Sequence, residues 1–126
     1  MSIITEAREQ GYIFEWARYH EQRFSELCLL HHVPNGGRRD KKEAASLKRQ
    51  GLKAGVPDIV LPVGRGGFLG LYIELKVGKN KPTEKQLEWI GKLQEENYFV
   101  KVCYGWREAT EVITSYLEQP KTIVNK

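Results

Sequence analysis

The 126-residue sequence has few cysteines, the residues that cross-link many small domains through disulfides or metal ions. It contains two cysteines, Cys28 and Cys103, which lie far apart and have no CxxC partner. This spacing argues against both a structural zinc site and a disulfide framework. The two thiols are better interpreted as small apolar groups in a core.

Long apolar runs are absent as well. No stretch approaches the length needed to cross a bilayer, and the first ten residues, MSIITEAREQ, lack a signal-peptide pattern. We therefore expect a cytoplasmic protein without a membrane partner. There is no internal repeat, low-complexity tract or linker, and hydrophobic residues make up 40% of the chain. These features predict one globular domain over residues 1–126.

Basic residues outnumber acidic ones, and they are clustered. The formal net charge is +4 and the pI is near 9.1, which suits a polyanionic partner without proving one. One basic cluster lies within residues 35–53, and a second follows the strand expected at 68–77. The members are Arg38, Arg39, Lys41, Lys42, Lys48, Arg49 and Lys53 in the first cluster, and Lys76, Lys79, Lys81 and Lys85 in the second.

Hydrophobic periodicity and turn signals predict an α/β fold. Asp40 with Glu43, and Thr83 with Gln86, have the spacing of helix N-terminal caps. The strands around the GRGG bend should pair antiparallel, whereas the helical crossover to the last strand implies a parallel neighbour. We expect a central mixed sheet flanked by helices. The expected helices are 5–26, 40–51, one from 83, and 106–118, and the expected strands are 26–33, 58–62, 68–77 and 98–105.

Two charged residues interrupt the apolar strand LYIELKV. Side chains alternate faces along a strand, so Glu74 and Lys76 share one face. Asp58 opens the preceding apolar run, and a hairpin would bring its carboxylate close to that of Glu74. Two adjacent carboxylates repel each other unless a cation neutralises them, and Mg²⁺ prefers such oxygen ligands. Lys76 could orient or deprotonate water, so the pattern favours phosphodiester hydrolysis. The simpler alternative is a surface ion pair of little energetic value.

These residues also carry a family resemblance. The dipeptide Pro57-Asp58 and the tripeptide Glu74-Leu75-Lys76 match the PD-(D/E)XK nuclease signature. The surrounding segments PNGGRRD, GVPDIVLPV, GLYIELK, TEKQLEWI and VKVCYGW make the match more specific. Over residues 6–113 the chain resembles a stand-alone, phage-type member of the VRR-NUC (virus-type replication-repair nuclease) family. That resemblance implies a restriction-endonuclease-like core, and the cytoplasm of a bacterium or a phage-infected host cell.

The resemblance implies a role for each matching residue. Asp58, Glu74 and the backbone carbonyl of Leu75 would bind a Mg²⁺ or Mn²⁺ ion, and Lys76 would act on the nucleophilic water. Gln86 would lie at the site, although it also occupies the capping-box position after Thr83.

An N-terminal glutamate is expected as a further metal ligand. Helix periodicity puts Glu6 and Glu9 on the side of Ile13, whereas Glu15 points away. The pattern Glu9-Gln10 followed by an apolar stretch resembles the family, so we select Glu9, with Glu6 as the alternative.

The implied activity is that of a structure-specific endodeoxyribonuclease. The resemblance suggests branched DNA such as four-way (Holliday) junctions, a homodimer, and a role in DNA repair or recombination. Two alternatives are a catalytically silent DNA-binding subunit and a sequence-specific restriction-type endonuclease. The three tryptophans are interpreted as core or interface anchors. The predicted DNA contacts are Asn35, Arg38, Arg39, Lys41 and Lys42.

Overall fold

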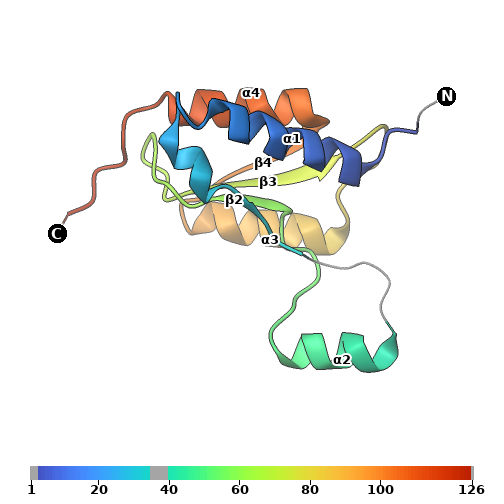
Figure 1. The fold of residues 1–126 in the computed structure, drawn as a ribbon. Helices are drawn as coiled ribbons and strands as arrows, with labels where there is room; N and C mark the ends of the chain where they lie inside the picture. Colours follow the sequence, from blue (N-terminus) through green and yellow to red (C-terminus); the bar gives the residue numbers. More distant parts are fainter. Residues whose placement is uncertain (1–2, 35–39, 126) are drawn as a thin grey trace.

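A mixed sheet forms the middle layer of the fold (Figure 1). The computed structural model describes residues 3–34 and 40–125. Four strands and five helical segments alternate along this part of the chain. They are α1 (Glu6–His20), the 3-10 helix η1 (Ser25–Leu29), β1 (His31–His32), α2 (Lys41–Arg49), β2 (Ile59–Leu61), β3 (Leu71–Lys76), α3 (Glu84–Glu95), β4 (Phe99–Tyr104) and α4 (Trp106–Leu117).

The strand pairing confirms the expected mixed α/β sheet. The order across the sheet is β1-β2-β3-β4. β2 is antiparallel to both β1 and β3, whereas β3 and β4 are parallel neighbours joined through α3. A helical crossover returns the chain to the same end of the sheet, which is why the last pair is parallel.

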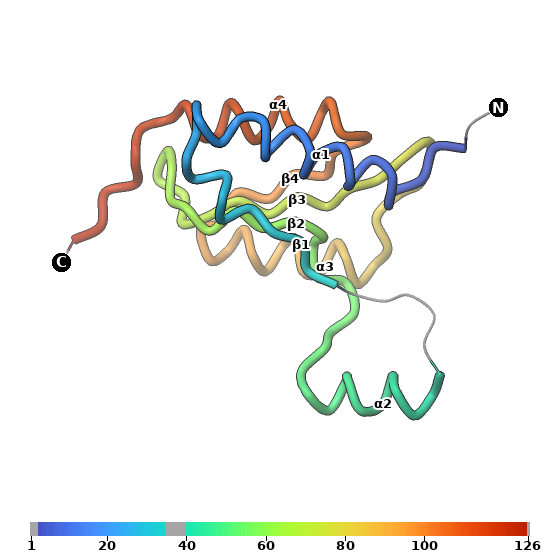
Figure 2. The backbone as a smooth tube through the Cα atoms, in the orientation of Figure 1, coloured from blue at the N-terminus to red at the C-terminus, as the bar shows by residue number. Residues whose placement is uncertain are grey.

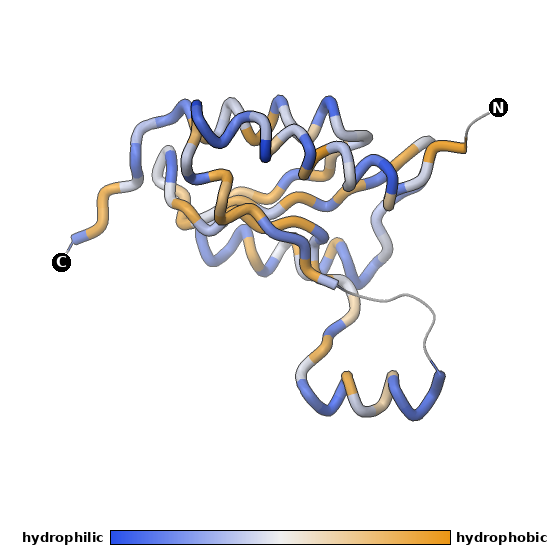
Figure 3. The backbone as a smooth tube through the Cα atoms, in the orientation of Figure 1, coloured by the Kyte–Doolittle hydropathy of each residue, from blue (hydrophilic) through white to orange (hydrophobic). Residues whose placement is uncertain are grey.

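The two faces of the sheet have different coverings. Figure 1 places α1 and α4 on one face and α3 on the other. Ile73 and Leu75 of β3 point into the main core, together with Ile13 of α1 and Ile113 of α4. Figure 3 shows the apolar segments gathered along the strands. Alternation along β3 therefore places Glu74 and Lys76 on the face opposite the main core.

The N-terminal elements are shorter than the sequence suggests. The helix expected over 5–26 ends at His20, where the backbone N–H groups of Arg23 and Phe24 bond to the His20 carbonyl. The strand expected over 26–33 is reduced to β1, because η1 precedes it and buries Leu27. A tight turn and η1 thus replace the expected end of the helix and start of the strand, and η1 places Leu27 in the core.

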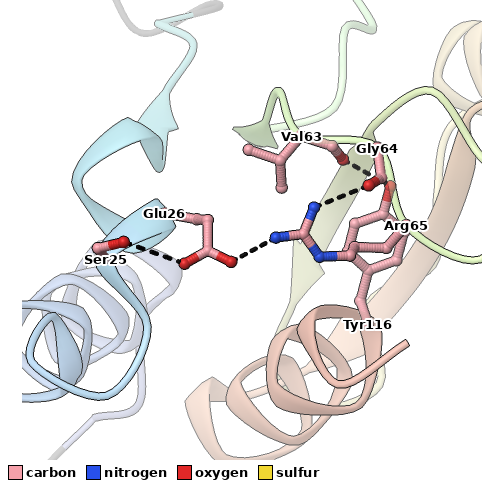
Figure 4. Close-up of polar contacts among 6 residues, drawn as sticks. All are labelled: Ser25, Glu26, Val63, Gly64, Arg65 and Tyr116. Atoms are coloured by element: carbon pink, nitrogen blue, oxygen red, sulfur yellow. Dashed lines mark hydrogen bonds and ion pairs between the residues drawn. The ribbon is translucent and has the colours of Figure 1, made fainter. Parts of the chain in front are cut away.

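An ion pair between the buried Arg65 and the partly buried Glu26 links η1 to the loop after β2 (Figure 4). Arg65 is only 6% exposed, and its guanidinium donates to the Glu26 carboxylate and, at 2.8 Å, to the Gly64 carbonyl. Nearby, the Tyr116 hydroxyl of α4 donates to the Val63 carbonyl at 2.8 Å. Because these bonds link three segments that are far apart in sequence, the GRGG region has a defined position rather than serving only as a bend.

Helix α2 projects away from the sheet (Figures 1 and 2). None of its described residues is buried. Asp40 caps the helix as expected, accepting a 2.7 Å hydrogen bond from the N–H of Glu43. The helix is thus held by its cap and by the adjoining chain rather than by a core. Within residues 3–34 and 40–125, no helix is long and apolar enough to span a membrane.

Candidate active site

Asp58 and Glu74 lie opposite each other on neighbouring strands. Ile59 pairs with Ile73 in the antiparallel register, and one step further along that register places Asp58 opposite Glu74. The Asp58 side chain accepts a 2.8 Å hydrogen bond from the N–H of Leu75, and its carbonyl accepts one of 2.7 Å from Val33. Asp58 is thereby held by β3 on one side and by the residue that follows β1 on the other.

Glu74 is a buried acid with an incomplete set of partners. Its side chain is 1% exposed, and its Oε2 lies 3.7 Å from the Nζ of Lys76, which is itself buried. Its Oε1 is buried without a hydrogen-bond partner among the described residues. Burial first, and then the negative charge of Asp58, raise the pKa of Glu74 above its ordinary value, and the charge of Lys76 partly opposes this rise. The fold thus favours the protonated, uncharged form of Glu74 up to a pH near its raised pKa of about 8, unless a cation is bound.

These residues fit a hard divalent cation. The unpartnered Oε1 of Glu74 and the repulsion between Glu74 and Asp58 are both features that a bound cation would relieve. The N–H and C=O of one strand residue point to the same edge, so the Leu75 carbonyl faces β2 and Asp58, as its N–H does. In the described ranges, no group of three or more His, Cys, Asp or Glu side chains could hold a metal. Two carboxylates and a carbonyl would leave positions for water and phosphate, as Mg²⁺ usually requires.

Glu9, selected above as the N-terminal acid, has another partner in the structure. Its Oε1 accepts a 3.1 Å hydrogen bond from the N–H of Trp106, the first residue of α4. The N-cap of α4 is Gly105, which has no side chain to accept such a bond, so Glu9 supplies the cap from α1.

The other candidate, Glu6, acts on the site electrostatically. Its charge contributes to the raised pKa of Glu74. Which of Glu6 and Glu9 is the N-terminal acid of the site stays a prediction, since Glu9 Oε1 is engaged by Trp106 and Glu6 makes only the smallest contribution to the raised pKa of Glu74. Helix periodicity could not separate the two, since both occupy the same side of α1. The glycine before Trp106 was the sequence signal that α4 needed a cap from elsewhere.

Gln86 forms the expected capping box at the start of α3. Its Oε1 accepts a 2.9 Å hydrogen bond from the N–H of Thr83, and its own N–H donates to the Thr83 hydroxyl at 3.2 Å. The side-chain oxygen is thus engaged in the cap. A role for Gln86 at the reacting phosphate stays a prediction.

The predicted DNA contacts are only partly covered by the structure. Lys41 and Lys42 lie in the first turn of α2, and both are exposed. Asn35, Arg38 and Arg39 lie outside the described residues. Contact of any of these residues with DNA stays a prediction.

The fold and the site together define a nuclease-type domain: a mixed α/β sheet that carries an opposed aspartate and glutamate with a neighbouring lysine. A family model described as the VRR-NUC domain matches residues 4–106. A solved structure described as a VRR_NUC domain protein is 30% identical in sequence, with a TM-score of 0.81, and the match covers 98% of this chain and 100% of that one. No curated protein matches the chain significantly. The chain belongs to the VRR-NUC domain family, which confirms the resemblance seen in the sequence.

Proposed function

We propose that this VRR-NUC domain is a Mg²⁺- or Mn²⁺-dependent endonuclease that hydrolyses phosphodiester bonds in branched DNA such as four-way junctions. One observation carries the proposal: Asp58 faces Glu74 across the sheet, and the buried Oε1 of Glu74 has no partner among the described residues. A buried acid without a full set of partners is costly to a purely structural domain. It is useful to a domain that binds a cation together with a phosphate.

Each residue of the site has a distinct task in this proposal. The bound ion would act as a Lewis acid toward the phosphate and lower the pKa of a bound water. Asp58, Glu74 and the Leu75 carbonyl would hold the ion. Lys76, buried beside Glu74, would orient the attacking water and offset negative charge that develops on the phosphate. Glu6 would add negative charge at the same end of the sheet.

The preference for branched DNA and the homodimer belong to the same proposal. The net charge of +4 and the exposed Lys41 and Lys42 support binding to a polyanion without reading its sequence. A four-way junction has four arms with approximate two-fold symmetry, and a two-fold dimer would present two sites across it. Both parts rest on this symmetry argument and on the family resemblance.

The test is a cleavage assay on DNAs of one sequence built as linear duplex, flap and four-way junction. Purified protein is incubated with each DNA in Mg²⁺, in Mn²⁺ and in EDTA, and sedimentation measures its oligomeric state. We expect metal-dependent cutting that is fastest on the junction. An Asp58→Asn preparation, purified in parallel, controls for contaminating nucleases. Binding without cutting under every condition would favour the silent DNA-binding subunit, and equal cutting of all three DNAs would remove the branch preference.

A further inference from the structure

A basic hollow lies between α2 and α3, outside the carboxylate site. It has a volume of about 570 Å³. Its walls come from the end of α2, the chain segment 52–54 and the first two turns of α3. The lining residues are Lys48, Leu52, Lys53, Ala54, Lys85, Glu88 and Trp89. The fold thus brings the two basic clusters of the sequence together in one concave surface.

Among the described residues, the three lysines of this hollow have no acidic ion-pair partner. Lys48, Lys53 and Lys85 are all exposed, and none forms an ion pair within the described parts of the chain. Glu88, the acid in the lining, pairs instead with Lys92 at 3.2 Å. Three like charges around one hollow repel one another, and a bound polyanion would relieve this repulsion.

The hollow also has an apolar part, made by Leu52 and the indole of Trp89. Trp89 is half-buried, and Gly55 packs so closely that a Cβ there would lie 3.0 Å from the Trp89 ring. The ring is therefore held in place from one side while it still lines the hollow. A fixed aromatic ring surrounded by cations is the usual platform for a nucleobase and its flanking phosphates.

A short stretch of chain links the hollow to the candidate active site. Its 52–54 wall continues through Pro57 into Asp58. A Cβ at Gly55 would lie 2.9 Å from the Lys85 carbonyl, so this segment rests directly on the first turn of α3. A DNA strand with its reacting phosphate between Asp58 and Glu74 could therefore continue into the hollow.

We propose that this hollow binds an unpaired nucleotide of the DNA substrate, with its base against Trp89 and its phosphates on Lys53 and Lys85. The inference rests on the proposed action on DNA. It specifies where the DNA strand lies beyond the reacting phosphate. An unpaired strand is favoured over a duplex because bases stacked inside a duplex cannot offer a face to an indole. It gives Trp89 a role beyond the core or interface anchor that the sequence suggested.

The first test measures binding of a fluorescent oligothymidylate, and of a duplex, by anisotropy in EDTA. Lys53→Ala with Lys85→Ala should weaken binding to the oligothymidylate and flatten its log–log salt slope by about 0.7 for each phosphate that is no longer neutralised. Trp89→Ala should weaken it by about tenfold or more, and Trp89→Phe should retain most of it. Each single lysine variant is compared with Lys101→Ala, which also removes one positive charge, because Lys101 is exposed and is paired with Ile73, whose side chain faces the other side of the sheet.

The second test does not depend on the folding of any variant. An oligothymidylate carrying 5-iodouracil is photocrosslinked to the wild-type protein, and the modified peptide is identified by mass spectrometry. We expect the crosslink on Trp89. Crosslinks confined to other peptides would overturn the proposal. So would equal losses on oligothymidylate and duplex, which would make the lysines general phosphate contacts.

These results separate the hollow from the nuclease proposal. Suppose that the wild-type protein cuts junctions and that the lysine and Trp89 variants bind oligothymidylate as well as Lys101→Ala does. This result would overturn the proposal for the hollow alone. Binding and crosslinking at Trp89 without any metal-dependent cutting would overturn the nuclease proposal alone. A wild-type protein that neither binds nor cuts DNA would overturn both.

Discussion

The Asp58 carboxylate accepts a hydrogen bond of 2.8 Å from the backbone N–H of Leu75. This bond joins the aspartate of the PD dipeptide to the central residue of the ELK tripeptide across two strands. Asp58 precedes β2, so its side chain extends the contacts between the two strands beyond the last backbone pair. The separation of the two carboxylates is therefore set by the sheet and not by a flexible loop.

The first prediction concerns Asp58→Asn. The amide oxygen can still accept from Leu75, so the fold and DNA binding should be retained, while one negative cation ligand is removed. Removing groups that only support metal ligands already costs about 10–100-fold. We expect this variant to lose more than about a hundredfold in the rate of junction cleavage. Rates come from single-turnover assays and folding from circular dichroism. Cleavage near the wild-type rate would show that the site lies elsewhere.

The second prediction concerns binding of a cation without any substrate. Glu74 and Asp58 repel each other in the folded chain, so an ion that binds both should stabilise the native state. The gain is about 2.7 kcal/mol when the ion is present at a hundred times its dissociation constant. Thermal unfolding is followed in EDTA, Mg²⁺ and Mn²⁺. The shift should vanish in Asp58→Asn, and an equal shift in that variant would place the ion at another position.

The third prediction compares two glycines. Gly55 has a φ of +94°, and a Cβ there would lie 2.9 Å from the Lys85 carbonyl, so Gly55→Ala combines backbone strain with a steric overlap. We expect a loss of at least about 2 kcal/mol in the free energy of unfolding. Because this segment leads into Asp58, slower cleavage should accompany it.

Gly91 in α3 is the matched control. A Cβ there would meet nothing within 4 Å, so Gly91→Ala should stabilise the helix by about 0.5–1 kcal/mol. Urea unfolding measures both variants. If Gly55→Ala were as stable as wild type, the segment would not rest on α3 as described.

The fourth prediction contrasts a partly buried ion pair with an exposed one. Arg65→Ala should destabilise the fold by about 2 kcal/mol, because it leaves the partly buried Glu26 carboxylate without its charged partner. The Arg23–Glu118 pair is 3.3 Å long with both side chains more than half exposed, so Arg23→Ala should cost less than about 1 kcal/mol. Equal costs for the two variants in urea unfolding would contradict the burial argument.

The same ion pair has a pH dependence of known sign. A backbone hydrogen bond at Glu26 and then the contacts with Arg65 lower the pKa of Glu26 below its ordinary value of 4.5. An acid whose pKa is lowered by folding stabilises the protein above its unfolded pKa, and this contribution disappears as the pH falls through the folded value. The difference in stability between wild type and Arg65→Ala should therefore shrink below about pH 4.5. A difference that grows on acidification would reverse the assignment.

The sequence alone was sufficient to predict the strand pairing of the sheet and the juxtaposition of Asp58 and Glu74. Strand alternation placed Glu74 and Lys76 on one face, and a hairpin followed by a helical crossover determined which strands run parallel. Side chains alternate between faces along a strand, and the length of a connection limits whether two strands run parallel or antiparallel. Both rules depend only on residues close in sequence, so they can be applied to the sequence alone. The caps at Asp40 and Thr83 are local in the same way, since each spans three residues.

Tertiary structure decided the features that depend on residues far apart in sequence. Glu9 and Glu6 share a helix side, and only the packing of α1 against α4 shows that Glu9 meets Trp106. A 3-10 helix replaces most of the expected strand at 26–33, and its Leu27 packs into the core formed by distant helices and strands. The hollow that unites Lys53 with Lys85 exists only because the segment before Asp58 packs on α3. Distances between remote residues follow from packing of the whole chain, and local periodicity carries no information about them.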